Sequence, residues 1–170
     1  MWRLLWLFPI LLSWAAPAAM AQGEGLVDLQ GRSRGLSDYT GKGQWTVVMI
    51  WASTCGVCRH DAPDVEAFYR RHKDDRAQVL GLSADSRANM ADAQGFVADY
   101  GLTFPNLVGD PEDVAALFYD MTGNNLTGTP AFLVFDPTGR LRTYQMGRME
   151  IALLESFMQQ QRISAAEAAE

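Results

Sequence analysis

The chain has 170 residues, of which 48% are hydrophobic and 20% charged, and its formal net charge at pH 7 is −6. This length suits a single domain with a full hydrophobic core, and the ordinary composition argues against extended disorder. The acidic balance argues against nucleic acid as a partner, because an acidic surface repels phosphate groups.

The first 21 residues have the pattern of a secretory signal peptide. Arg3 supplies a positive charge, residues 4–12 are almost wholly apolar, and Ala19-Met20-Ala21 places small residues where signal peptidase cleaves. An uncleaved N-terminal membrane anchor is the alternative, although this apolar stretch is shorter than the roughly 20 residues that span a bilayer. In both cases we expect the domain that follows, residues 26–163, to work outside the cytoplasm, in a bacterial periplasm.

A strand, a helix and a second strand are predicted in the first half of this domain. Trp45 to Trp51 is a continuous apolar run with the length of a buried central strand. Apolar and aromatic residues then recur at helical spacing from Ala62 to His72, and Gln78 to Ser83 has the composition of another strand. This order predicts a βαβ unit with two parallel strands.

The second half alternates helices with strands and closes with a hairpin and a helix. In chain order we expect a helix over 90–100, a short strand over 104–108, a helix from Pro111, strands over 131–135 and 141–146, and a helix over 151–158. The turn sequence Asp136-Pro137-Thr138-Gly139 separates the two hairpin strands. The Ala- and Glu-rich end, Ser164 to Glu170, is expected to fray.

Both cysteines of the chain, Cys55 and Cys58, directly follow the predicted strand Trp45 to Trp51. A strand that delivers Cys-x-x-Cys to the start of a helix places the first sulfur near unpaired backbone N–H groups and the positive end of the helix dipole. Those partial charges stabilise a thiolate, which is the reactive species in thiol–disulfide exchange. The sequence therefore predicts a redox-active dithiol.

Metal binding is the alternative use of the two cysteines. Together with His60 they would offer ligands that Cu(I) or Zn(II) accepts. However, His60 lies on a different helical face from Cys58, and the other histidine, His72, is more than three turns away. Arg59 also occupies the position that a haem attachment sequence gives to histidine. We therefore expect no metal ligands and no cofactor.

The order of these features resembles the thioredoxin fold. Trp-x-x-x-Cys-x-x-Cys on a βαβ unit is followed by Thr129-Pro130, a hairpin and a closing helix, and the match covers about residues 26–158. The leader, the stretch Leu36 to Lys42 and the extra helix and strand at about 86–108 are similar to those of the extracytoplasmic TlpA and ResA branch, which includes the cytochrome c biogenesis thiol reductases. The resemblance implies an α/β fold with a central mixed sheet, flanking helices and an inserted helix–strand segment.

The resemblance also implies roles for particular residues. Cys55 matches the attacking cysteine and Cys58 the resolving one. Asp61 stands where ResA-like proteins carry a glutamate that assists proton transfer, although an acid in the first turn of a helix is favourable in any protein. Pro130 matches the cis-proline that lies against the dithiol. The substrate-binding residues implied are Trp51, beneath the site, Gly56, Val57, Pro130 and Thr129, where backbone groups pair with the substrate.

Two departures from the thioredoxin pattern bear on mechanism. Met49 replaces the buried aspartate of cytoplasmic thioredoxins, so Cys58 must lose its proton to Asp61 or to water. The neutral pair Gly56-Val57 replaces the Pro-His of strong oxidants, which favours a reductant.

The function implied is an extracytoplasmic thiol–disulfide oxidoreductase that reduces protein disulfides, with cytochrome c maturation as one setting. Its partners would be proteins with disulfides and a membrane electron donor of the DsbD or CcdA kind. The alternatives are a periplasmic oxidant or isomerase and a Cu(I)- or Zn(II)-binding dithiol carrier.

Overall fold

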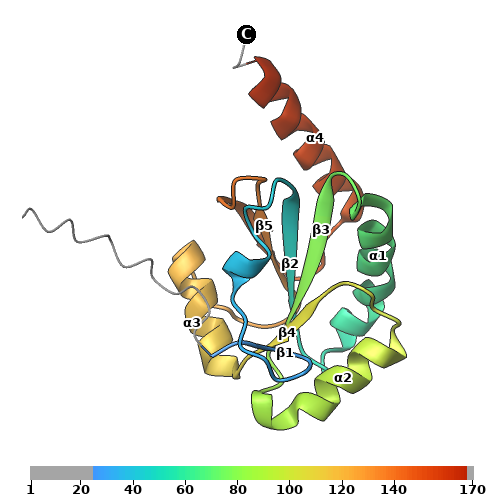
Figure 1. The fold of residues 1–170 in the computed structure, drawn as a ribbon, viewed down its shortest axis with the longest axis vertical. Coiled ribbons are helices and arrows are strands. Elements are labelled where there is room, and N and C mark those ends of the chain that lie inside the picture. The colour runs from blue at the N-terminus through green and yellow to red at the C-terminus, as the bar shows by residue number, and fades with distance from the viewer. Residues whose placement is uncertain (1–24, 168–170) are drawn as a thin grey trace, which may run out of the picture.

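The computed structural model describes residues 25–167, which form a six-stranded mixed sheet with helices on both faces (Figure 1). In chain order the elements are β1 (Val27–Asp28), η1 (Leu36–Asp38), β2 (Trp45–Trp51), α1 (Gly56–His72), β3 (Ala77–Ser83), η2 (Arg87–Asn89), α2 (Met90–Asp99), β4 (Asn106–Val108), α3 (Pro111–Thr122), β5 (Ala131–Phe135), β6 (Leu141–Met146) and α4 (Ile151–Glu167).

The strand order is β1-β4-β3-β2-β5-β6. Strand β2 pairs in parallel with β3 and antiparallel with β5, and β3 pairs in parallel with β4. The two edge strands, β1 and β6, are both antiparallel to their neighbours. The predicted βαβ unit, the hairpin and the inserted α2–β4 segment are therefore confirmed, as is the thioredoxin-like mixed sheet.

Strand β2 is apolar throughout because both faces of the sheet are covered. All seven of its residues are buried. Val47, Met49 and Trp51 belong to a cluster with side chains of α1, α2 and α4, whereas Val48 and Ile50 belong to a second cluster with α3. Side chains alternate between the two faces of a strand, so each cluster takes every second residue.

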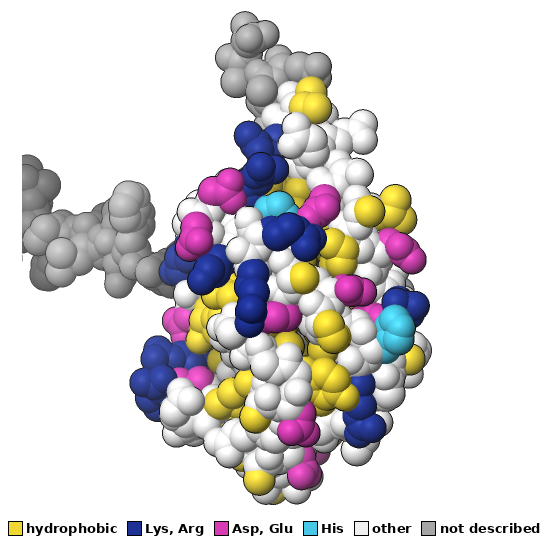
Figure 2. Space-filling model, turned by 90° about the vertical axis from the view of Figure 1, so that its right-hand side faces the viewer, with side chains coloured by type: hydrophobic (Ala, Val, Ile, Leu, Met, Phe, Trp, Pro, Cys, Tyr) yellow, Lys and Arg dark blue, Asp and Glu magenta, His cyan; other side chains and the backbone are white. Residues whose placement is uncertain are grey.

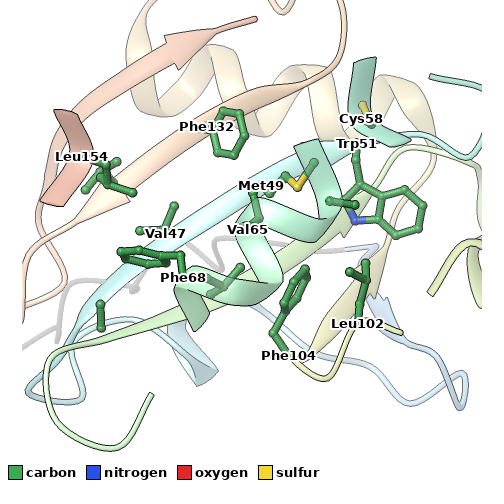
Figure 3. Close-up of a cluster of buried hydrophobic side chains, with 14 of the residues drawn as sticks. Val47, Met49, Trp51, Cys58, Val65, Phe68, Leu102, Phe104, Phe132 and Leu154 are labelled. Carbon is green, nitrogen blue, oxygen red and sulfur yellow. The ribbon is translucent and has the colours of Figure 1, made fainter. Parts of the chain in front are cut away.

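The cluster beneath α1 contains one of the two cysteines. Figure 3 shows Cys58 and Trp51 at one end of this cluster and Leu154, from α4, at the other. Phe68 of α1 is also fully buried in it. Cys58 is therefore a core residue, and the helix that carries it is fixed to the sheet by apolar packing.

Helix α4 continues further than the sequence predicts. It ends at Glu167, whereas fraying was expected from Ser164. Gln and Ala, which recur in its second half, favour the helical conformation. Figure 1 shows that the end of α4 runs out beyond the sheet.

The face seen in Figure 2 carries basic and acidic side chains next to one another. Two ion pairs involve arginines of α1, with Arg70 bonded to Glu66 of the same helix and Arg71 bonded to Glu155 of α4. Among the described residues, no helix combines the length and the apolar character that crossing a bilayer requires. The expected signal peptide, residues 1–21, lies outside the described part of the chain.

Candidate active site

The two cysteines lie where β2 ends and α1 begins, as the sequence predicts. Cys55 is the N-cap residue of α1, and its Sγ accepts a hydrogen bond of 3.0 Å from the backbone N–H of Cys58. This N–H is one of the donors that a helix start leaves without a partner. The two sulfurs form a disulfide, with their Cα atoms 5.2 Å apart. The same donor would stabilise a thiolate at Cys55 after reduction.

The two sulfurs differ in their access to solvent. Cys58 has an exposed fraction of 0%, whereas Cys55 is partly exposed. A disulfide that approaches from solvent therefore meets Cys55 first. Cys58 can be reached only from within the protein.

The loop that joins α3 to β5 lies against this dithiol. The Thr129–Pro130 peptide bond is cis, as expected. Cys55 Sγ lies 3.3 Å from the carbonyl oxygen of Thr129. The carbonyl oxygen of Pro130 accepts a hydrogen bond of 2.8 Å from the N–H of Gly147, just after β6. The loop is thus held between Cys55 and the end of the hairpin.

Trp51 lies beneath the site and is fully buried. Its ring stacks on Phe96 of α2, with centroids 4.3 Å apart, and its Nε1–H donates to Asn106 Oδ1 of β4. Because Trp51 has no exposed surface, it lies beneath the site, and the expected contact with a substrate would require it to become exposed.

Apolar side chains are exposed on both sides of the dithiol loop. Val57 follows Cys55 by two residues and is 44% exposed, and Gly56 beside it is also exposed. Met146, which the sequence does not mark, is 41% exposed and pairs with Ala131, the residue after Pro130. These groups form an exposed apolar surface beside the dithiol.

Asp61 lies in the second turn of α1, because the helix begins at Gly56, and not in the first turn as expected. The carboxylate is 4% exposed. Its Oδ1 accepts a hydrogen bond of 2.8 Å from Arg148 Nε, and His60 Nδ1 lies 3.2 Å from the same oxygen. Its Oδ2 is buried with no hydrogen-bond partner among the described residues. Cys58 stands three residues earlier, on the same helix face.

Asp85, which no sequence pattern marks, fixes the loop that leads into Cys55. Ser53 donates to the carboxylate of Asp85 through its N–H at 2.9 Å and through its hydroxyl at 2.8 Å. The same carboxylate accepts from the hydroxyl of Ser83 at 2.7 Å. The carbonyl oxygen of Ser53 accepts two hydrogen bonds from the guanidinium of Arg59.

Both histidines are engaged by carboxylates. His60 lies beside Asp61, and His72 Nε2 is 2.8 Å from Glu155 Oε1. Within residues 25–167, no group of three or more His, Cys, Asp or Glu side chains is placed to hold a metal ion.

The chain matches a known family and several characterised relatives. The sequence pattern of the AhpC/TSA family matches residues 14–144. The thiol-disulfide oxidoreductase ResA of Bacillus anthracis is 23% identical over 133 residues, which cover 78% of this chain and 71% of that protein. The sporulation thiol-disulfide oxidoreductase A of Bacillus subtilis is 22% identical, with 70% and 69% covered.

Solved structures show the same fold. A secreted Mycobacterium tuberculosis disulfide oxidoreductase homologous to Escherichia coli DsbE has a TM-score of 0.62 at 21% identity and covers 83% of this chain and 98% of its own. The DsbF protein of M. tuberculosis has a TM-score of 0.65 at 25% identity, with 82% and 96% covered. With its Cys55–Cys58 pair on this fold, the chain belongs to the AhpC/TSA family and is a thioredoxin-like thiol–disulfide oxidoreductase.

Proposed function

We propose that this protein reduces disulfides of other proteins outside the cytoplasm, with Cys55 as the attacking residue and Cys58 as the resolving one. The observation that carries the proposal is the contrast between a partly exposed Cys55 that caps α1 and a fully buried Cys58. The helix start favours a thiolate at the sulfur that a substrate can reach. Burial keeps the second sulfur away from competing disulfides.

The reaction has two exchange steps. The Cys55 thiolate attacks one sulfur of the substrate disulfide, the substrate S–S bond breaks, and one substrate thiolate leaves. Cys58 then gives its proton to Asp61 or to water and attacks Cys55 Sγ. The mixed disulfide breaks, the second substrate thiolate leaves, and the Cys55–Cys58 disulfide forms. Two electrons have passed from the protein dithiol to the substrate.

The substrate chain is proposed to lie across the cis-proline loop. The nearness of Cys55 Sγ to the Thr129 carbonyl oxygen, 3.3 Å, supports this placement, because a substrate sulfur bonded to Cys55 would lie beside the same backbone. Gly56 and Val57 provide the exposed surface on the other side, and Pro130 holds the loop against the dithiol.

The residues between the two cysteines support the proposed direction of electron flow. Gly56 and Val57 add no charge to the helix start, so the two residues between the cysteines do not stabilise the Cys55 thiolate further. A moderately stabilised thiolate makes a more reducing dithiol than a strongly stabilised one, as in DsbA. We therefore propose a reductant, with the disulfide of an apocytochrome c haem-binding site among its substrates.

The protein must be reduced again after each cycle, and it must reach the periplasm. Each cycle leaves Cys55 and Cys58 oxidised, so a membrane electron donor of the DsbD or CcdA kind must reduce them. The signal-like residues 1–21 and the secreted relative from M. tuberculosis support a periplasmic location. The mass of the protein recovered from the periplasm distinguishes cleavage after Ala21 from a retained membrane anchor.

Two assays test the reductant. The reduced protein should precipitate insulin by reducing its disulfides, and its potential, measured in glutathione buffers, should lie nearer the about −270 mV of thioredoxin than the about −120 mV of DsbA. A potential near that of DsbA would make the protein an oxidant.

Substrate trapping tests the assignment of the two cysteines. The Cys58→Ser variant should accumulate mixed disulfides with substrate proteins, because the resolving step is blocked. The Cys55→Ser variant, as the matched control, should trap none. Equal trapping by both variants would overturn the assignment.

A further inference from the structure

Asp61 is a buried carboxylate whose two oxygens have different surroundings. Oδ1 receives a charge-assisted hydrogen bond from Arg148 and lies beside His60, whereas Oδ2 is buried without a partner among the described residues. A buried polar atom with no partner is uncommon in folded proteins. Oδ2 is therefore the oxygen of Asp61 that can still accept a hydrogen bond or a proton.

Arg148 reaches Asp61 from a distant part of the chain. It lies between β6 and α4, 87 residues after Asp61. The preceding residue, Gly147, donates to the carbonyl oxygen of Pro130, and the carbonyl oxygen of Arg148 itself accepts from the side chain of Gln145. The backbone at Arg148 is thus anchored to the cis-proline loop and to β6.

Few other charges lie near this pair. His60, on α1, is the second group on Oδ1, and its side chain is 66% exposed. Asp64, Arg71 and Glu150 line a small groove together with Arg148, on the side of the guanidinium. Asp64 and Glu150 are both exposed, so water screens their charges. Within residues 25–167, Arg148, whose side chain is 57% exposed, is the arginine in direct contact with Asp61.

We propose that Arg148 is a positioning residue for the resolving step, which holds the Asp61 carboxylate by Oδ1 and leaves Oδ2 free to accept the proton of Cys58. This inference rests on the proposed role of Asp61 as the proton acceptor. The geometry separates the two oxygens by function, because the cation occupies Oδ1 alone. A charge-assisted hydrogen bond to Oδ1 fixes the orientation of the carboxylate, so Oδ2 keeps one direction during the resolving step.

The resolving step can be followed directly with dithiobis(nitrobenzoate). Cys55 of the reduced protein attacks the reagent, releases one nitrothiobenzoate and keeps the other in a mixed disulfide. Cys58 then attacks Cys55 and releases the second nitrothiobenzoate, which is coloured. The rate of this second phase, measured against pH, reports the loss of the Cys58 proton.

Removing the guanidinium should move this pH profile. We expect the midpoint of the second phase in Arg148→Gln to lie about one pH unit or more above that of the wild type, since the group that accepts the Cys58 proton has lost its hydrogen-bonded cation. The midpoint should not shift when Arg148→Gln is added to Asp61→Asn. The matched control is Arg142→Gln, because Arg142 is also an exposed arginine that pairs with an aspartate, Asp136, at 3.4 Å. This control should keep the wild-type profile.

Two other outcomes of this experiment would contradict the proposals. An unshifted profile in Arg148→Gln, or an equal shift with and without Asp61, overturns the positioning role. A wild-type protein that never releases the second nitrothiobenzoate overturns the proposed reaction itself. Urea unfolding of every variant shows whether a change in rate reflects loss of the fold.

Discussion

Trp51 and Asn106 are joined by a buried hydrogen bond of 3.2 Å from the indole Nε1–H to the amide Oδ1. Trp51 ends β2 directly before the dithiol loop, and Asn106 begins β4 of the inserted segment. Gly81 of β3 lies between them, paired with Met49 on one side and Asn106 on the other. A Cβ atom at Gly81 would overlap Asn106 Oδ1 and lie 2.9 Å from Trp51 Nε1. The bond that ties the insertion to the site thus depends on a glycine.

Gly81→Ala should destabilise the protein. The added methyl group must displace the Asn106 side chain, which overpacks the core and breaks the bond to Trp51. We expect a loss of about 1–3 kcal/mol in the free energy of unfolding, measured with urea. Gly95→Ala is the matched control, because Gly95 lies in α2 with open space around the position of its Cβ. This control should gain about 0.5–1 kcal/mol from helix propensity; equal stability of the two variants would contradict the prediction.

Asp85→Ala should loosen the loop that precedes Cys55. Without the carboxylate, the N–H and hydroxyl of Ser53 and the hydroxyl of Ser83 lose their acceptor. We expect a loss of about 1–3 kcal/mol in stability and faster hydrogen exchange of the Ser53 amide, measured by NMR. Asp99→Ala, which removes an exposed acid of α2 from the neighbouring groove, should leave that amide protected. Unchanged exchange in Asp85→Ala would show that the loop is held by other contacts.

Glu66 should make stability depend on pH in the acid range. Burial alone raises the pKa of Glu66, but hydrogen bonds from the hydroxyl and N–H of Thr103 and from Arg70 outweigh it, so the pKa is lowered. A carboxylate with a lowered folded pKa binds its proton more readily when unfolded. Its contribution is therefore complete above the unfolded value, about 4.3, and is lost as the pH falls through the folded value.

The measurement compares the wild type with Glu66→Gln. At pH 7 the variant should be less stable by about 1.5–3 kcal/mol, the contribution of hydrogen bonds to a charged group. The difference should shrink as the pH approaches 3, because the protonated wild type then resembles the variant. The exposed Glu150→Gln should differ from the wild type by less than about 0.5 kcal/mol at both pH values. A difference that is constant with pH would show that the charge of Glu66 does not matter.

Much of the fold follows from local patterns in the sequence. The apolar run that predicts β2 ends at Trp51, as the strand does, because a strand covered on both faces needs apolar residues throughout. Pro111 marks the first residue of α3 for the reason that its missing N–H costs nothing there. The dithiol could be placed for the same local reason, since Cys55 stands between a strand and a helix.

The contacts that complete the site could not be predicted in this way. Arg148 meets Asp61 across 87 residues and Asp85 meets Ser53 across 32, and no periodicity or spacing marks such pairs. The pairing depends on which loops the sheet order brings together at one edge. The one sequence signal for the Trp51–Asn106 bond is Gly81, inside the apolar strand β3. A glycine weakens a strand, so its presence there indicates that another side chain comes close to the backbone.

The reactivity of Cys55 tests the physical basis of the proposed reductant. In the reduced Cys58→Ser variant, the backbone N–H at position 58 remains to stabilise a thiolate at Cys55. We expect its labelling by iodoacetamide to have a pH midpoint between about 3.5 and 7.5, below the about 8.5 of free cysteine. The Cys55→Ser variant leaves only the buried Cys58, which should label more slowly and with a midpoint at or above the free value. Equal midpoints near the free value in both variants would mean that the helix start does not activate Cys55, and the attacking step would lose its explanation.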